Sequence, residues 1–552
     1  MSHNRSSVRS SSQHSFAVTP RVDIPRSSFR RNLTYKTTLN AGYLVPIFLD
    51  EVLPGDTFNL QLTSFSRILS ALQYPIMDNL YMDFQFFYVP IRLVYDDYEK
   101  FFGSSEGADG KWKYDDSHLM PGITSPTNGW TAQSLGDYFG LPIGVDDLRV
   151  NCLPFRCYNR IISDWYLPSS YELDSPVLKT DSTDDDPDDY PLVKRLKRSD
   201  YFTASLISPQ RGDGVELPLG GFAPVVGNGT VLGLTDGNIE AGVGYVSGQG
   251  LAVGASVYGQ SVGSSFTSSS LGVKGLGVVD DGDKSGLVAD LSGATAATIN
   301  SLRQAFQLQR ALERDMRGGV RYVEQLLSHF GVRSPDARLQ RSEYLGGGSI
   351  PVQIHTVANT TSAGSTAQAS LAAYGVTSQQ HVGFVKSFVE HGYVLGLVSV
   401  RADLTYQQGV PRMFDRWARF DFYYPVFAHL GEQVVKNKEI FAQGSTVLDD
   451  DGNQVDEQVF GYQERYAEYR YSVSKITGQL RSTYATPLDA WHLAQKFNNL
   501  PVLNQEFLEE NVPMSRVKSV QSGPDFLYDS LISLNCVRPM PLFGVPGLVD
   551  HF

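Results

Sequence analysis

The feature that most constrains the fold of this chain is a two-residue alternation between apolar and polar side chains. It is clearest at 81–89, where Phe84 and Phe86 fall on one face of an extended segment and Asp83 and Gln85 on the other. Strands with one buried face alternate in this way, whereas helices repeat about every 3.6 residues. Further segments with strand character lie at 57–63, 350–357, 393–406, 424–430 and 531–537. The chain is therefore predicted to be mainly β.

Helices are few in this pattern. An apolar stripe at 302–317 and a second one at 321–330 are each followed by glycine, which readily takes the left-handed conformation that ends helices. A third helix is predicted at 486–498, because its first residues combine a capping hydroxyl, a proline and an acid.

Length and composition exclude several classes of protein. The chain has 552 residues, about the length of three to four average domains, and 41% of them are apolar. Its three cysteines are too few for a disulfide framework, which favours a reducing compartment. The N-terminal residues show no apolar signal-peptide core, and no apolar run approaches the about 18 residues of a membrane span. We therefore expect a globular protein without membrane insertion.

The charge is distributed unevenly. The formal net charge is −13, which argues against a protein that coats nucleic acid over its whole surface. The first 36 residues nevertheless carry seven basic side chains against Asp23 alone. This segment is interpreted either as a solvated tail or as a basic arm that lies along phosphates or a packaging protein. The candidate contact residues are Arg5, Arg9, Arg21, Arg26, Arg30, Arg31 and Lys36.

Residues 201–300 have a composition of their own. They hold 21 of the 51 glycines, many serines and valines, and only three basic residues. Such a segment forms either short strands joined by glycine turns or a flexible low-complexity stretch. We interpret it as an insertion that projects from the core.

Motifs for catalysis or metal binding are missing from the sequence. It contains no phosphate-binding loop, no His-Glu-x-x-His motif and no paired Cys-x-x-Cys. The aspartate-rich segment 181–198 leaves a calcium site open, but its irregular spacing favours a solvated or interface charge pair. The aspartates at 449–451 are out of register with a calcium loop. We predict no metal, no cofactor and no enzymatic activity, although a carboxylate pair formed by folding stays open.

The segment 460–471, FGYQERYAEYRY, alternates aromatic and charged residues. As a strand it would have no plain apolar face, and tyrosine and arginine are enriched where proteins meet. We predict a subunit interface here, with a polar edge strand as the alternative. Its candidate residues are Tyr462, Arg465, Tyr466, Tyr469, Arg470 and Tyr471.

Several segments resemble the major capsid protein family of the gokushoviruses (Microviridae), which are small icosahedral phages with single-stranded DNA. The similarity is carried by 84–103, FQFFYVPIRLVYDDYEKFFG, by 153–166, LPFRCYNRIISDWY, and by the segment 460–471. The long run 302–347 is the most specific match. Residues 201–300 match only by position, where this family has a variable insertion.

The resemblance implies a fold and a role. The fold would be an eight-stranded antiparallel jelly roll with long loop insertions and a few short helices. Sixty copies would form a T=1 shell around circular single-stranded DNA, together with a small basic packaging protein. Scaffolding and pilot proteins would take part in assembly in the bacterial cytoplasm, and a host receptor would be a further partner.

This resemblance also divides the chain. The expected parts are a basic arm at 1–36, a first core part at 37–200, the insertion at 201–300 and a second core part with helices at 301–552. In this family the insertion clusters at threefold axes as a surface protrusion. The residues taken to represent it are Val243, Tyr245, Val246, Val257 and Tyr258.

Two other classes of function compete with a capsid role. An enzyme on a β-sandwich would need a carboxylate pair in a cleft with exposed aromatic side chains. A secreted or surface β-rich carbohydrate-binding protein or adhesin would suit the glycine- and serine-rich segments, but it would need a secretion signal.

Overall fold

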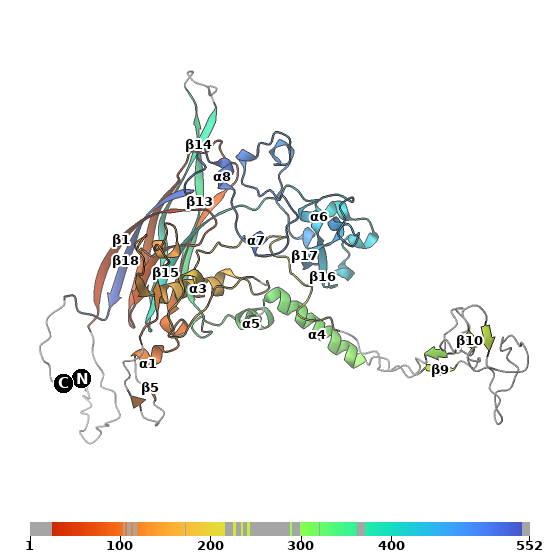
Figure 1. The fold of residues 1–552 in the computed structure, drawn as a ribbon, viewed down its shortest axis with the longest axis horizontal. Coiled ribbons are helices and arrows are strands. Elements are labelled where there is room, and N and C mark those ends of the chain that lie inside the picture. The colour runs from red at the N-terminus through yellow and green to blue at the C-terminus, as the bar shows by residue number, and fades with distance from the viewer. Residues whose placement is uncertain are drawn as a thin grey trace, which may run out of the picture. The chain divides into compact units, whose positions relative to one another are not determined.

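Eight long strands build one antiparallel sheet in the computed structural model (Figure 1). They are β1 (Ser27–Leu39), β2 (Val45–Val52), β3 (Thr57–Ile68), β4 (Leu80–Pro90), β13 (Glu343–Ala358), β14 (Leu371–Ser387), β15 (Gly392–Ala402) and β18 (Phe526–Arg538). Their order across the sheet is β1-β18-β3-β14-β13-β4-β15-β2. The first strand of the eight thus pairs with the last, the second with the seventh, the third with the sixth and the fourth with the fifth. This nested pairing is the topology of a jelly roll, so the predicted fold class is confirmed.

The structure describes residues 25–102, 119–171, 173–215, 300–319, 321–360 and 370–543, and the backbone of residue 299 and of six short strands. Those short strands are β5 (Ser105–Glu106), β6 (Trp112–Lys113), β9 (Val225–Gly227), β10 (Gly233–Thr235), β11 (Glu240–Gly242) and β12 (Leu287–Ala289).

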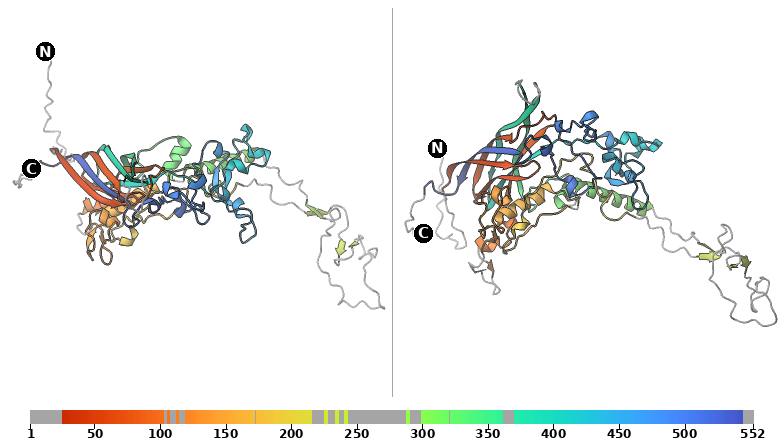
Figure 2. Two further views of the ribbon diagram at one scale, coloured as in Figure 1. Left: turned by 90° about the horizontal axis from the view of Figure 1, so that it is seen from above. Right: turned by 45° about the horizontal axis from the view of Figure 1, so that its top comes forward.

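The sheet folds into two layers because β13 changes partner along its length. Residues 353–358 pair with β14, whereas residues 343–352 pair with β4. One layer is β1-β18-β3-β14, in which the first and last strands lie side by side, red and blue in Figure 2. The other is β13-β4-β15-β2. Every second residue of β3 is buried, whereas β15 is buried along its whole length. The first layer is therefore covered on one face and the second on both.

The core between the layers confirms the alternation predicted for residues 81–89. Phe84, Phe86 and Tyr88 of β4 pack in this core, against residues of β3, β15 and β18. Phe87 points to the opposite side of β4 and packs in a second cluster. Because alternate strand side chains face opposite sides, one strand contributes to two cores.

The second cluster is built by the connection between β4 and β13, which returns over the outer face of the second layer. Its main element is α3 (Leu153–Ile161), which contributes Leu153, Phe155 and Tyr158 to the buried cluster. The other elements here are η2 (Ile91–Leu93), α1 (Tyr98–Phe102), β7 (Gly122–Thr124), α2 (Leu135–Tyr138), β8 (Arg149–Asn151), η3 (Ile162–Tyr166) and η4 (Pro187–Asp189). All three cysteines are buried free thiols.

The opening between the end strands β1 and β2 is bridged by α2. The Tyr138 hydroxyl donates to the carbonyl oxygen of Thr38 at 2.9 Å. The Tyr35 hydroxyl of β1 donates to the carbonyl oxygen of Tyr138 at 3.0 Å. These bonds tie the edge of the jelly roll to the connection that covers it.

The aspartate-rich segment contains a buried ion pair. Arg156 of α3 donates from Nε and one terminal nitrogen to the two oxygens of Asp185, at 2.8 and 2.7 Å. Its remaining hydrogens reach backbone carbonyl oxygens, and Tyr190 donates its hydroxyl to Asp185 at 2.5 Å. Among the described residues, no group of three or more His, Cys, Asp or Glu side chains is arranged to hold a metal. This part of the segment therefore has a structural role.

The connection between β15 and β18 forms a third cluster with Val435, Ile440, Phe460 and Phe507, and Phe202 of the connection between β4 and β13 packs into it. Its strands and helices are β16 (Glu432–Lys436), α6 (Asn437–Ile440), β17 (Val459–Glu464), α7 (Gln505–Leu508) and α8 (Met514–Val517). Its 3-10 turns are η6 (Arg412–Asp415), η7 (Arg419–Asp421), η8 (Pro425–Phe427), η9 (Val455–Glu457), η10 (Ala467–Tyr469), η11 (Gly478–Leu480) and η12 (Asp489–Trp491).

The helix predicted at 486–498 is wrong, since only the turn η12 forms there. Tertiary contacts replace the helical ones. The backbone N–H of Leu493 donates to the Asp78 carboxylate at 2.5 Å, and the Trp491 ring stacks on Tyr74 with centroids 5.1 Å apart.

Residues 210–314 form a compact unit separate from the rest of the chain. In it β10 pairs with β11, and β9 pairs with β12.

The two remaining predicted helices are confirmed as α4 (Ile299–Gly318) and α5 (Tyr322–Phe330), the latter ended by Gly331 at φ 68°. In the part of the chain that is described, no helix has the length and apolar character needed to cross a membrane. The candidate protrusion residues Val243, Tyr245, Val246, Val257 and Tyr258 lie outside the described residues.

Candidate subunit interface

A dense group of large apolar side chains is exposed on the connection between β15 and β18. Trp417 is 85% exposed and Val426 84%. We call the group the aromatic surface, and its members are Met413, Phe414, Trp417, Phe420, Phe422, Tyr423, Tyr424, Val426, Leu430 and Tyr469. Single exposed apolar residues are ordinary, but a concentration of this size marks a site of protein–protein contact.

The segment exposes these side chains because it forms turns rather than a strand. Pro411 precedes η6 and Pro425 opens η8, and neither proline can donate a ladder hydrogen bond. The strand predicted at 424–430 is therefore wrong. Within the turns the rings of Phe420 and Phe427 meet edge to face at 5.3 Å between centroids.

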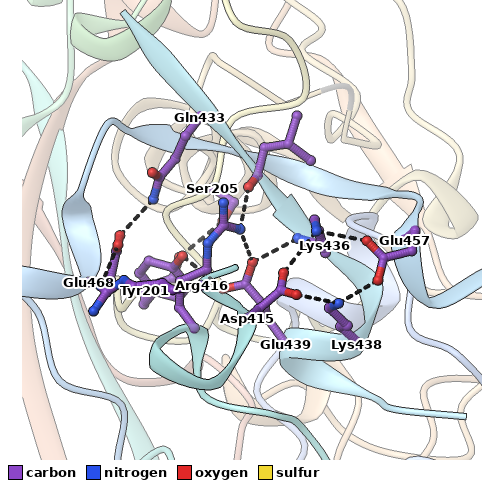
Figure 3. Close-up of polar contacts among 12 residues, drawn as sticks. Tyr201, Ser205, Asp415, Arg416, Gln433, Lys436, Lys438, Glu439, Glu457 and Glu468 are labelled. Carbon is purple, nitrogen blue, oxygen red and sulfur yellow. Dashed lines mark hydrogen bonds and ion pairs between the residues drawn. The ribbon is translucent and has the colours of Figure 1, made fainter. Parts of the chain in front are cut away.

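A buried polar cluster supports the first turn of this segment (Figure 3). The Asp415 carboxylate accepts hydrogen bonds from Lys436 Nζ at 2.8 Å and from Lys438 Nζ at 2.6 Å. It also accepts a hydrogen bond from the indole N–H of Trp417 at 3.1 Å. Both lysines form ion pairs with the Glu457 carboxylate as well. Burial alone would raise the pKa of Asp415, but the hydrogen bonds from the two lysines outweigh burial and lower it to about 2. The cluster therefore stays charged at neutral pH.

A second buried carboxylate ties the same turn to α6. Glu439 accepts from an Arg412 terminal nitrogen at 2.5 Å, from the Lys436 backbone N–H at 2.9 Å and from the Tyr201 hydroxyl at 3.0 Å. Burial raises the pKa of Tyr201, so the phenol remains a donor. Arg412 also donates to the carbonyl oxygen of Val434 at 2.8 Å.

A third carboxylate links the turns to the end of β17. Glu468 accepts from Arg416 at 2.9 Å and from Gln433 Nε2 at 2.8 Å (Figure 3). The Arg416 guanidinium lies over the Tyr469 ring, 4.3 Å from its centroid. Two buried carboxylates and the half-buried Glu468 thus hold the backbone beneath the aromatic surface, and a surface held rigid in advance loses less conformational entropy on binding.

The structure separates the interface residues predicted from the segment 460–471. The predicted strand ends at Glu464, and Tyr466 has a left-handed φ of 62° before η10. Tyr466 is buried, so it supports the turn from inside and cannot reach a partner. Tyr469, Arg470 and Tyr471 are exposed, whereas Tyr462 and Arg465 are half-buried. The interface stays a prediction, centred on the exposed members.

The sequence analysis missed the aromatic surface. The run 417–427, WARFDFYYPVF, contains six aromatic residues with charges and a proline between them. This density breaks both helical and strand periodicity, which is the signal that could have indicated exposed turns.

Four of the basic residues predicted to contact DNA or a packaging protein lie among the described residues, and three have partners within the chain. Arg26 donates to Thr57 Oγ1 at 3.0 Å, Arg31 pairs with Asp50 at 2.5 Å and Lys36 pairs with Asp529 at 2.5 Å. Arg30 is exposed on β1. Because β1 begins at Ser27, part of the predicted arm is an edge strand of the jelly roll. Arg5, Arg9 and Arg21 lie outside the described residues.

Known proteins are similar to this chain over almost its whole length. Residues 17–548 match the family described as "Capsid protein (F protein)". Capsid protein VP1 of Bdellovibrio phage phiMH2K is 43% identical over 550 residues, which cover 98% of each chain. Capsid protein VP1 of Chlamydia phage 1 is 41% identical, and that of Spiroplasma virus 4 is 36% identical, each over 97% of both chains. The similarity therefore includes the jelly roll and both of its long connections.

Proposed function

Because this chain belongs to the capsid protein (F protein) family, a family of structural virion proteins, we propose that sixty copies of it assemble into a closed T=1 shell around circular single-stranded DNA. The chain has a jelly roll with two long connections, an architecture that places large loop surfaces around a stable core. Scaffolding and pilot proteins would act on it during assembly in the bacterial cytoplasm.

The aromatic surface is the observation that carries the assembly proposal. Its side chains are exposed in the single chain, yet buried and half-buried carboxylates hold their backbone in place. Covering such a surface with a second copy removes apolar area from water at about 25 cal/mol per Å². Homo-oligomers bury surfaces of this kind in symmetric contacts.

The assembly proposal is tested by expressing the full chain in bacteria and examining the purified protein by sedimentation and negative-stain electron microscopy. The expected result is closed icosahedral particles of uniform size. A chain that has native circular dichroism but stays monomeric at every concentration, even when it is co-expressed with the scaffolding proteins, would contradict the proposal.

The basic residues near the N-terminus are proposed to face the packaged DNA or the small basic packaging protein. Among the described residues Arg30 is favoured, because Arg26, Arg31 and Lys36 already have partners within the chain, and Arg5, Arg9 and Arg21 stay candidates outside the described residues. An arginine without an acidic partner releases a counterion when it meets a phosphate, which is the main source of affinity for nucleic acid.

The insertion is proposed to form a surface protrusion that attaches the virion to a host receptor. Replacing residues 215–290 by a short linker is expected to leave shell assembly intact and to reduce adsorption to host cells severely. Its low content of basic residues fits an outward face better than one toward DNA. Particle yield and cell binding are measured on the same preparation. If all assembly is lost, the insertion is structural and the attachment role is wrong.

A further inference from the structure

A partly open cavity is formed mainly by the connection between β15 and β18, with Tyr201 and Phe202 of the connection between β4 and β13 completing its wall. Its volume is about 400 Å³, within the range of pockets that hold a small ligand. Much of its wall is aromatic or aliphatic, and these lining residues include Phe202, Tyr406, Met413, Tyr469, Tyr471 and Ile476. The wall therefore offers flat apolar faces to a ligand.

The same wall has a surplus of two positive charges. Its cations are Arg412, Arg416, Lys475 and Arg481, and its carboxylates are Glu439 and Glu468. Each carboxylate is already paired, Glu439 with Arg412 at 2.5 Å and Glu468 with Arg416 at 2.9 Å. Within the described part of the chain, Lys475 and Arg481 have no ion-pair partner. On a chain with a net charge of −13, this surplus indicates an anionic ligand.

A buried donor in the wall also lacks a partner. The Nε of Arg416 is buried and makes no hydrogen bond with the described residues. This nitrogen has almost no exposed surface, so a ligand oxygen would reach it only if the neighbouring side chains moved. The stack of the Arg416 guanidinium on the Tyr469 ring holds this donor beside an aromatic face.

We propose that this cavity binds one nucleotide of a single-stranded nucleic acid. The unpaired base would lie against Tyr471, which is not part of the aromatic surface, and the phosphates on either side of it would pair with Lys475 and Arg481. Stacking on aromatic side chains combined with basic residues along the backbone is how single strands are bound without sequence preference. This inference rests on the proposed enclosure of single-stranded DNA and names a site for it.

A nucleotide fits the charges better than a peptide does. Each nucleotide within a strand is flanked by two phosphates, which matches the two unpaired cations in the lining of this cavity. A peptide would match these charges only if it carried acidic residues on both sides of an aromatic side chain. Peptide binding is therefore the competing outcome of the test.

The test measures binding of fluorescently labelled oligo-dT to the purified full chain by anisotropy. Tyr471→Ala is expected to weaken binding about tenfold, the size of one lost base stack. Lys475→Ala with Arg481→Ala is expected to lower the slope of log Kd against log salt by about 1.4, because two phosphate contacts are lost.

Matched controls lie outside the cavity. Tyr484 is exposed to a similar extent as Tyr471, and Lys496 is an exposed lysine absent from the lining. Tyr484→Ala and Lys496→Ala are expected to leave both affinity and salt slope unchanged. The proposal would be overturned if the control variants lost as much affinity as the cavity variants, or if the cavity variants bound oligo-dT as tightly as the unaltered chain. It would also be overturned if the cavity bound an aromatic peptide and not oligo-dT. Shell assembly of the same variants is measured by sedimentation. Variants that assemble normally but do not bind oligo-dT differently would contradict this nucleotide site without contradicting the capsid role.

Discussion

Replacing Asp185 with asparagine or Arg156 with methionine is expected to lower the free energy of unfolding by about 3–5 kcal/mol. The Arg156 side chain is 1% exposed and the Asp185 side chain is fully buried, with two hydrogen bonds between them at 2.8 and 2.7 Å. Removing Arg156 leaves the Asp185 carboxylate with only the more distant Lys179, at 3.9 Å, and removing the charge of Asp185 leaves Arg156 with only Asp181, at 3.6 Å. Because the pair joins α3 to the aspartate-rich segment, the loss should be seen in chemical denaturation of the full chain.

The neighbouring pair Arg149–Asp184 is a matched control. It has similar geometry, at 3.0 and 2.7 Å, but its side chains are 58% and 53% exposed. Asp184→Asn and Arg149→Met are therefore expected to lower the free energy of unfolding far less than the variants of the buried pair. If the buried and the exposed variants lost equal stability, burial would not be the source of the effect.

The contrast between Asp184 and Asp185 shows where sequence reasoning stops. Both belong to one run of aspartates, and the sequence favoured a charge pair over a metal site for that run. Spacing could not identify the partner, because Arg156 lies 29 residues before Asp185. Nor could the spacing of residues show which of two adjacent carboxylates is buried, since their burial depends on the packing of α3.

The parts of the fold that sequence predicted are those set by local chemistry. The strand predicted from the alternation at 81–89 is confirmed, because its apolar side chains face a core on each side of β4. The end of α5 was predicted because Gly331 supplies the left-handed residue that the chain needs there. The helix expected at 486–498 failed because Asp78, hundreds of residues earlier, takes the N–H of Leu493. The expectation of a jelly roll came from the family resemblance, and the order of the strands was not predicted, since pairing of distant strands has no local signal.

The candidate interface was predicted in part for the same reason. Tyr469 and Tyr471 were identified by residue type, and both are exposed. The larger part, at 413–430, was missed because its exposure depends on Asp415, Glu439 and Glu468 binding cations from β16, α6 and the turns themselves. Those contacts are set by tertiary structure and leave no periodic pattern.

Val426→Asp is expected to abolish shell assembly while leaving the subunit folded. The Val426 side chain is 84% exposed, so aspartate costs the single chain less than about 0.5 kcal/mol. In a subunit contact the same carboxylate would be removed from water without a partner, at a cost of several kcal/mol. Every copy in a closed shell carries the change, so the cost recurs at each contact that uses the aromatic surface. Sedimentation and electron microscopy should show subunits with native circular dichroism and no particles.

Val389 provides the control that separates a specific contact from a general effect of added charge. It is 82% exposed and lies just beyond the end of β14, outside the aromatic surface. Val389→Asp adds the same charge to the same residue type at nearly the same exposure, and particles are expected to form as in the unaltered chain. If both variants assemble, the aromatic surface is not a subunit contact. If neither assembles, added negative charge on an already acidic chain is sufficient to block assembly, and the assignment of the contact to 413–430 is wrong.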